Sequence, residues 1–151
     1  MKIEIGSKAP DFNLFDQNGK SFNLSENLGS SIIVLYFYPK NETPGCITEA
    51  CSFRDNMLDL EGYNCKVVGI SSDSIKSHTR FTNHYNLPFT LLSDPKNLVR
   101  KLYGVESSIF GFLPGRKTYL INKQGFITHI FDYQFKAKKH VLDTLKALAN
   151  E

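Results

Sequence analysis

The longest apolar run of the chain, residues 31–39 with the sequence SIIVLYFYP, limits the fold more than any other feature. Side chains of a strand alternate between its two faces, so a strand that is apolar at nearly every position must be covered on both. This pattern is typical of an inner strand of an α/β sheet. The run is much shorter than the roughly 18 apolar residues of a membrane-spanning helix, so we expect no membrane association.

Strand and helix patterns alternate along the rest of the chain. Helical patterns occupy residues 44–63, 74–86, 95–104 and 138–151, and strand patterns occupy 66–72, 89–94 and both sides of Gln124-Gly125 within 117–132. Residues 11–24 carry two short Phe- and Leu-bearing runs around Asn18-Gly19 and predict a peripheral β-hairpin. The order indicates an α/β protein whose sheet ends in an antiparallel pair. It resembles a thioredoxin-like fold with an N-terminal β-hairpin extension and a central mixed sheet flanked by helices.

Length, charge and cysteine count narrow the class of protein. A chain of 151 residues can bury one continuous core, so we expect a single domain over residues 1–151. The net charge is only +3, and the one dense basic cluster, 136–140, fits the exposed face of the last helix, so no nucleic-acid partner is expected. Three cysteines argue against a secreted disulfide framework, and the first residues lack the apolar segment of a secretory signal. We therefore expect a cytoplasmic location.

The loop after the apolar strand predicts a reactive thiol. Thr43 is a favoured N-cap residue and Pro44 a favoured first helical residue, which puts Cys46 in the first turn of a helix. Backbone N–H groups lack intrahelical partners there and the helix dipole is positive, so a thiolate is stabilised. Functional groups of α/β sheets also gather at the carboxyl ends of strands.

A thiolate alone is a modest catalyst, because its nucleophilicity falls as its basicity falls. Fast chemistry needs donors aimed at the charge that develops in the transition state. The Thr43 hydroxyl and the N–H groups near Gly45 and Cys46 are such donors, and Gly45 leaves room for close approach. Arg116 begins a later strand, where its guanidinium could reach the thiol, and the apolar ring of Pro39 could limit water around the sulfur.

These residues also carry a resemblance to a known family. Pro39, Thr43 and Cys46 form the PxxxTxxC signature of peroxiredoxins. The chain also contains the segments YFYPK, EAC.FRDN, GIS.D, F.LLSD and R.TYLI, in which a dot stands for one residue of any type. With these segments it resembles the bacterioferritin-comigratory or peroxiredoxin Q subgroup from about residue 5 to the last helix. The resemblance implies that Cys46 is the peroxidatic cysteine, that Thr43 and Arg116 hydrogen-bond the peroxide and the thiolate, that Pro39 shields the pocket, and that Glu49 orients the arginine. Segment 107–115, SSIFGFLPG, departs most from the subgroup pattern and either walls the pocket or packs on the core.

Cys51 matches subgroup members that carry a resolving cysteine in the same helix. In an intact helix the Cα atoms of residues five apart are about 8.6 Å apart and their side chains point about 140° apart. A disulfide needs less than about 7 Å and converging side chains. Resolution therefore requires the first turns to unwind once Cys46 has become a sulfenic acid, which no longer gains from the helix dipole. Cys65, at the start of a strand, is expected to be structural.

The resemblance implies a thiol peroxidase that reduces hydrogen peroxide and organic hydroperoxides through a Cys46–Cys51 disulfide. A thioredoxin-like dithiol would recycle it, as in an atypical 2-Cys peroxiredoxin, and the enzyme would be a monomer without metal or cofactor. Three alternatives stay open: a protein thiol–disulfide oxidoreductase, a copper or zinc carrier, and a redox-dependent binding module. The spacing CxxxxC, rather than CxxC, argues against the first. The four histidines show no metal-ligand spacing, which argues against the second.

Overall fold

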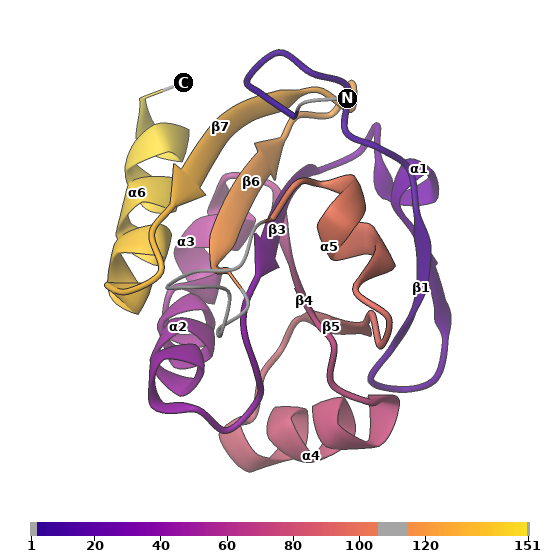
Figure 1. Cartoon of the computed structure of the whole chain (residues 1–151). Helices are drawn as coiled ribbons and strands as arrows, with labels where there is room; N and C mark the ends of the chain where they lie inside the picture. The colour runs from indigo at the N-terminus through magenta and orange to yellow at the C-terminus, as the bar shows by residue number, and fades with distance from the viewer. Residues whose placement is uncertain (1–2, 106–114, 151) are drawn as a thin grey trace.

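A seven-stranded mixed sheet forms the centre of the computed structural model, which describes residues 3–105 and 115–150 (Figure 1). The strand order is β2-β1-β5-β4-β3-β6-β7. Strands β3, β4 and β5 are parallel, and the other pairings are antiparallel. The strands are β1 (Asn13–Asp16), β2 (Ser21–Asn23), β3 (Ile32–Phe37), β4 (Cys65–Ser71), β5 (Thr90–Ser93), β6 (Lys117–Ile121) and β7 (Ile127–Asp132).

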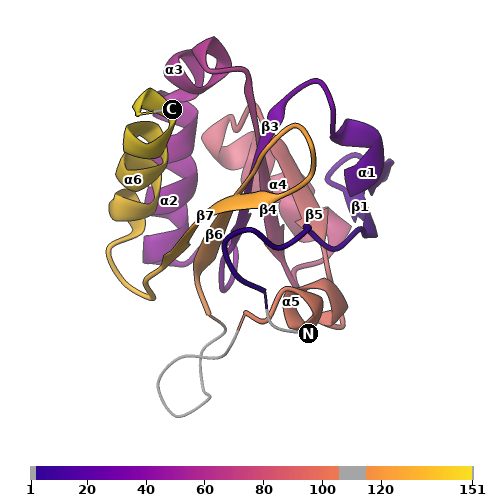
Figure 2. The ribbon, with the colours of Figure 1, turned by 90° about the horizontal axis from the view of Figure 1, so that it is seen from above.

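Helices cover both faces of this sheet (Figure 2). They are α1 (Leu24–Asn27), α2 (Pro44–Asp55), α3 (Met57–Gly62), α4 (Ile75–Tyr85), α5 (Leu98–Leu102) and α6 (Ala137–Ala149). Figure 2 shows α2 and α6 packed side by side on one face, with α5 on the other. No helix among residues 3–105 and 115–150 is long and apolar enough to cross a membrane.

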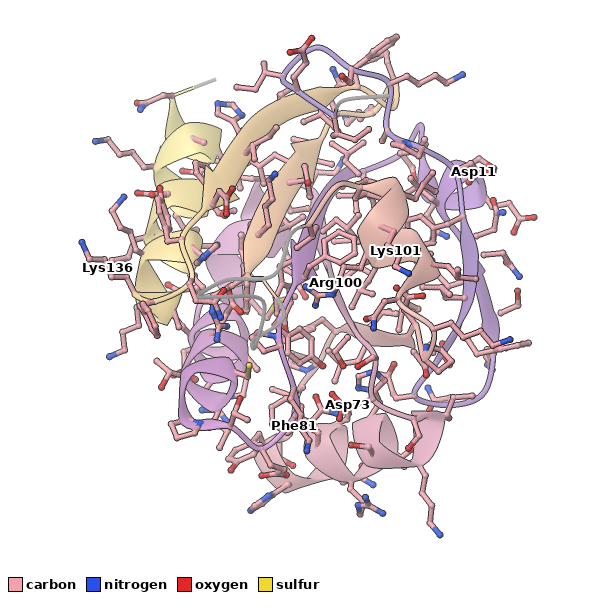
Figure 3. The ribbon with its side chains drawn as sticks, viewed as in Figure 1. Asp11, Asp73, Phe81, Arg100, Lys101 and Lys136 are labelled. Carbon is pink, nitrogen blue, oxygen red and sulfur yellow. The ribbon has the colours of Figure 1, made fainter. Side chains whose placement is uncertain are left out.

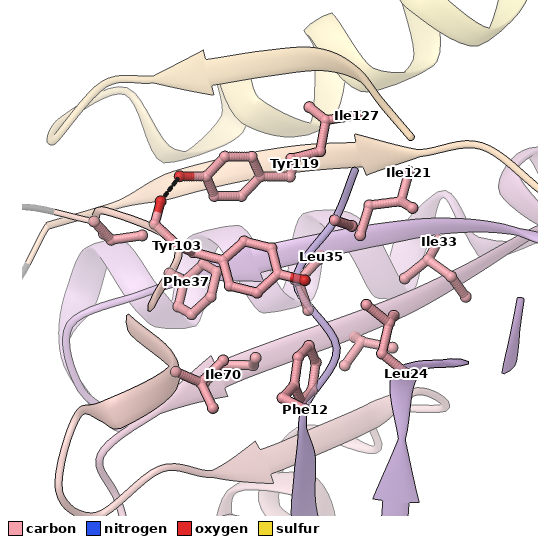
Figure 4. Close-up of a cluster of buried hydrophobic side chains, with 14 of the residues drawn as sticks. Phe12, Leu24, Ile33, Leu35, Phe37, Ile70, Tyr103, Tyr119, Ile121 and Ile127 are labelled. Carbon is pink, nitrogen blue, oxygen red and sulfur yellow. Dashed lines mark hydrogen bonds between the residues drawn. The ribbon is translucent and has the colours of Figure 1, made fainter. Parts of the chain in front are cut away.

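Strand β3 lies in the middle of the sheet and is buried on both faces, as its sequence predicted. Ile33, Leu35 and Phe37 pack with residues of α1, α5 and the N-terminal segment in the cluster that Figure 4 shows. Val34 and Tyr36 point to the opposite face, into a second cluster formed with α2, α3, α4 and α6. The strand therefore fixes both halves of the core.

The N-terminal hairpin is part of the sheet. β1 pairs with β5, so the hairpin forms one edge of the seven strands. Phe12, which precedes β1, is buried and packs edge-on against the ring of Tyr103. The predicted hairpin is confirmed and lies at the periphery, but it also extends the sheet, and Leu14 and Phe22 pack partly buried against the core.

The helix predicted over residues 44–63 is divided at Asn56 into α2 and α3. The Asn56 side-chain amide donates to the carbonyl of Ser52 at 2.8 Å, and its backbone N–H bonds to the carbonyl of Phe53. Asparagine bonds readily to nearby backbone groups and so competes with continuous helix.

Residues 106–114 lie outside the described residues, and with them most of the segment 107–115 that was expected to wall the pocket or pack on the core.

The register of β3 and β6 brings distant residues together. Phe37, the last residue of β3, is paired with Lys117, the first residue of β6. The chain enters α2 shortly after Phe37, and Arg116 directly precedes Lys117. The antiparallel pairing therefore places Arg116 beside the start of α2.

Candidate active site

Helix α2 begins as its sequence predicts, except for the role of the Thr43 side chain. Thr43 has extended backbone angles at the N-cap position and Pro44 is the first helical residue. The Thr43 hydroxyl makes no cap hydrogen bond and instead donates to the carbonyl of Lys40 at 2.8 Å. The predicted N-cap position of Thr43 is confirmed, but its hydroxyl proton, expected to serve as a donor in the site, is directed to Lys40. Because the hydroxyl turns back to the loop, the N–H groups of Gly45 and Cys46 keep neither a Thr43 partner nor an intrahelical one.

The Cys46 thiol lies in the first turn of α2 against the guanidinium of Arg116. Nη2 of Arg116 is 3.4 Å from Cys46 Sγ, and both side chains are buried, with exposed fractions of 5% and 1%. Nε of Arg116 donates to the carbonyl of Gln134 at 3.0 Å, which fixes the plane of the guanidinium. A Cβ atom on Gly45 would lie 3.0 Å from Nη2, so Gly45 gives the guanidinium the room that the sequence predicted.

Glu49 is the second partner of Arg116. Its Oε1 accepts from Nη1 of Arg116 at 2.5 Å, and its side chain is completely buried, which excludes a solvated helix carboxylate. Burial raises the pKa of Glu49 to about 7, although the adjacent Arg116 charge opposes the rise. Burial alone would lower the pKa of Arg116, but Glu49 and Cys46 together raise it above its usual value. One guanidinium thus joins the thiol and the carboxyl.

His140 on α6 closes this buried polar group from the other side. Its Nε2 lies 2.8 Å from the carbonyl of Tyr133, which can only accept, so Nε2 carries the proton and Nδ1 accepts from the Thr118 hydroxyl at 2.8 Å. Nδ1 is 3.9 Å from Oε2 of Glu49, and that oxygen has no hydrogen-bond partner among the residues that the structure describes. Burial lowers the pKa of His140 to about 4. Nothing in the sequence around His140 indicated this position.

A cavity of about 350 Å³ opens beside the guanidinium. Two charged residues line it, the buried Arg116 and the exposed Lys136, and the ring of Phe135 is exposed. Pro39 lines it as well. Its lining residues are Pro39, Thr43, Pro44, Gly45, Arg116, Gln134, Phe135, Lys136 and Ala137.

A second buried network anchors the loop between β3 and α2. The Tyr38 hydroxyl donates to Oδ1 of Asn41 at 2.6 Å, and the Asn41 amide contacts Nδ1 of His78 at 2.9 Å. The backbone N–H of Asn41 donates to the Asp73 carboxylate at 2.9 Å. Sequence reasoning missed this network, because its members come from two segments, 38–41 and 73–78, that are distant in sequence and meet only in the folded chain.

The other two cysteines occupy different surroundings. Cys51 lies in α2 with Cys46 and is partly exposed, and both are thiols in an intact helix. Cys65 is the first residue of β4 and pairs with Ile32 at the start of β3, at the end of the sheet opposite Cys46. The structure thus places Cys51, but not Cys65, on the helix that carries the predicted nucleophile.

The family comparison agrees with this arrangement. The model of the AhpC/TSA family matches residues 5–130. The chain belongs to the AhpC/TSA family. This AhpC/TSA chain is 48% identical to the chloroplastic peroxiredoxin Q of Triticum aestivum over 149 residues, which are 99% of this chain and 68% of that protein. It is also 48% identical to the chloroplastic peroxiredoxin Q of Oryza sativa subsp. japonica, over 97% of this chain and 67% of that protein.

Solved structures of the same family superpose closely. Peroxidoxin BcpB from Mycobacterium tuberculosis gives a TM-score of 0.90 at 31% identity, covering 98% of this chain and 97% of that one. A cysteine-to-serine mutant of PrxQ from Xylella fastidiosa gives 0.85 at 30% identity, covering 99% of both chains. The thioredoxin-like fold and the resemblance to peroxiredoxin Q are confirmed. The findings support a thiol-dependent peroxidase and do not favour a general protein thiol–disulfide oxidoreductase.

Proposed function

We propose that this AhpC/TSA family member reduces hydrogen peroxide and organic hydroperoxides with Cys46 as the nucleophile. The observation that carries the proposal is the 3.4 Å contact between Cys46 Sγ and Arg116 Nη2, made inside a buried group with Glu49 and beside a cavity. The bacterioferritin comigratory protein of Xanthomonas campestris, a protein with alkyl peroxide reduction activity, is 28% identical to this chain with a TM-score of 0.86. That relative supports the inclusion of organic hydroperoxides.

In the first step the Cys46 thiolate attacks the terminal oxygen of the peroxide. An S–O bond forms, the O–O bond breaks, and the peroxide proton passes to the leaving oxygen, which gives water or an alcohol and a sulfenate. The sulfenate takes a proton from solvent and becomes the sulfenic acid. Arg116 and the N–H groups of Gly45 and Cys46 stabilise the negative charge that moves onto the oxygens, and each such donor contributes roughly 10² to 10³ in rate. Because the Thr43 proton is directed to Lys40, the Thr43 oxygen is available to accept from the peroxide O–H.

In the second step Cys51 attacks the Cys46 sulfenic acid, which forms the disulfide and releases water. The helix geometry of α2 forbids this bond, so the turns from Pro44 to Cys51 must open first. A thioredoxin-like dithiol then reduces the disulfide and is itself oxidised. We further propose a monomeric enzyme and keep the cytoplasmic location as a prediction; the relatives described above are chloroplastic.

Peroxide consumption with a thioredoxin system, measured in parallel for the wild type and three variants, tests this scheme. Cys46→Ser should abolish consumption. Cys51→Ser should allow one turnover and then stop, because its sulfenic acid has no resolving thiol. Cys65→Ser is the matched control and should keep wild-type turnover. Undiminished steady-state turnover in Cys51→Ser would remove Cys51 from the mechanism, and activity in Cys46→Ser would overturn the proposal.

A further inference from the structure

Arg100 is a buried arginine that the scheme above does not use. It lies on α5, on the face of the sheet opposite α2, and its exposed fraction is only 6%. Figure 3 shows its side chain directed from α5 toward the carboxyl end of β3. Nη1 donates to the carbonyl of Gly115 and Nη2 to the carbonyl of Tyr38, both at 2.7 Å. One planar guanidinium therefore holds two backbone segments that are 77 residues apart in sequence (residues 38 and 115).

These two carbonyls belong to the residues that directly precede two members of the candidate site. Tyr38 precedes Pro39, which lines the cavity, and Gly115 precedes Arg116, which contacts the thiol. The two segments lie just beyond the paired ends of β3 and β6, where sheet hydrogen bonds no longer set their distance. The Arg100 guanidinium continues that connection past the end of the sheet.

Among residues 3–105 and 115–150, no carboxylate forms a hydrogen bond or ion pair with the Arg100 guanidinium. Asp94 accepts instead from the backbone N–H groups of Leu98 and Arg100 at 3.0 Å each. Burial lowers the pKa of Arg100, while Asp94 and Cys46 act in the opposite direction. The carbonyls of Tyr38 and Gly115 are therefore the groups that hold the guanidinium in place.

We propose that Arg100 is a positioning residue for peroxide reduction, which holds the Pro39 and Arg116 segments in register. This inference rests on the proposed function of Cys46. The bonds from the Arg100 guanidinium to the carbonyls of Tyr38 and Gly115 set the distance between the two segments.

Three substitutions test this role in a Cys51→Ser, Cys65→Ser background, where Cys46 is the one remaining thiol. Arg100→Gln removes the charge and shortens the donor group. Arg100→Lys keeps the charge but cannot hold both carbonyls with a planar fork. Lys101→Gln is the matched control, because it removes the same charge from an exposed neighbour on α5.

The first readout is the rate of Cys46 alkylation by iodoacetamide as a function of pH. The profile should stay close to that of the background in all three variants, because alkylation requires the Cys46 thiol but no donors placed for a peroxide. The second readout is single-turnover oxidation by hydrogen peroxide. Because the chain has no tryptophan, the sulfenic acid is followed by dimedone trapping and mass spectrometry.

Both Arg100 variants should oxidise about 10- to 100-fold more slowly than the background, because a small misplacement of a catalytic group has effects of this size. Thermal unfolding measured alongside identifies variants that are only less stable. If a folded Arg100→Gln keeps the background oxidation rate, or if its alkylation and oxidation rates fall together, Arg100 is merely structural. If Arg100→Gln does not fold, Arg100→Lys still decides the positioning role, since a background oxidation rate there contradicts it. A background protein that is itself slow with peroxide refutes the proposed function, whereas a fast background with equally fast Arg100 variants refutes only the role of Arg100.

Discussion

Gly45 affects both the stability of the start of α2 and the position of the Arg116 guanidinium. It lies in the first turn of α2, where any side chain would face the guanidinium, and a Cβ would come within 3.0 Å of Arg116 Nη2. That atom cannot retreat freely, because Arg116 is also bonded to Glu49 and to the carbonyl of Gln134. The glycine therefore weakens the helix start while it permits the closest approach of the cation to the sulfur.

Replacing Gly45 by alanine should separate helix stability from catalysis. Alanine favours helix over glycine by up to about 1 kcal/mol, so the free energy of unfolding should hold or rise slightly. The rate of single-turnover Cys46 oxidation should fall about tenfold or more, because the guanidinium is displaced. Gly62→Ala in α3 is the matched control, since nothing lies within 4 Å of its Cβ position. Equal oxidation rates in the two variants would show that the contact with Arg116 does not matter.

Sequence patterns identify some of these residues and miss others for a physical reason. Cys46 follows from helix-start chemistry, and Arg116 and Glu49 follow from the family resemblance. The orientation of the Thr43 hydroxyl depends on where the Lys40 carbonyl points, which is a property of the folded loop. Arg100 reads as a surface residue of a short helix, and only the folded chain brings the carbonyls of distant segments to it.

In the proposed mechanism, helix α2 has to be stable enough to hold the thiol and weak enough to open. Its buried face consists of Cys46, Glu49, Ala50 and Phe53, so the first turns pack mainly through polar groups and the last through apolar ones. Opening the helix as far as Cys51 would break the Glu49–Arg116 bond but could leave Phe53 in the core. The apolar spacing of residues 44–63 did not reveal the break at Asn56, where we expect such unwinding to end.

Amide hydrogen exchange should detect this opening. After one equivalent of peroxide, peptides covering residues 44–51 should lose protection in the wild type, because the disulfide cannot form in an intact helix. Peptides of α4 and α6 should keep theirs. The Cys51→Ser variant, which stops at the sulfenic acid, should stay close to the reduced pattern. Full protection of residues 44–51 in a protein shown by mass spectrometry to carry the Cys46–Cys51 disulfide would contradict the unwinding step.

At the scale of the whole molecule, three elements meet at one buried polar group. Glu49 comes from α2, Arg116 precedes β6, and His140 comes from α6. The element order and the covered sheet were predictable from periodicity, but this meeting point was not, because it depends on how α6 packs beside α2. The two titratable side chains respond to pH with opposite sign. Both are fully buried, so burial favours the neutral form of each.

Glu49 and His140 contribute to stability over different pH ranges. Burial raises the pKa of Glu49 from 4.5 to about 7, so its contribution to stability is complete below pH 4.5 and is lost as the pH rises through 7. Burial lowers the pKa of His140 from 6.5 to about 4, so its contribution is complete above pH 6.5 and is lost as the pH falls through 4. Each shift corresponds to roughly 3 kcal/mol. Between pH 4.5 and 6.5 the two contributions should largely cancel in the wild type.

Substituting either Glu49 or His140 should therefore reveal the pH dependence of stability that the other residue causes. In Glu49→Gln the free energy of unfolding should increase by up to about 3 kcal/mol from pH 4.5 to 6.5, relative to the wild type. The reason is that the loss of stability that ionisation of Glu49 causes as the pH rises is absent. In His140→Gln the free energy of unfolding should decrease by a similar amount between pH 4.5 and 7. Urea unfolding at four pH values across this window measures both slopes, and the exposed His84→Gln serves as control. The other histidines contribute equally to every variant, so only the difference in slope counts. Slopes of the same sign in Glu49→Gln and His140→Gln would show that the two side chains do not act as an opposed pair, and that the orphaned Glu49 oxygen is satisfied by some group other than a proton.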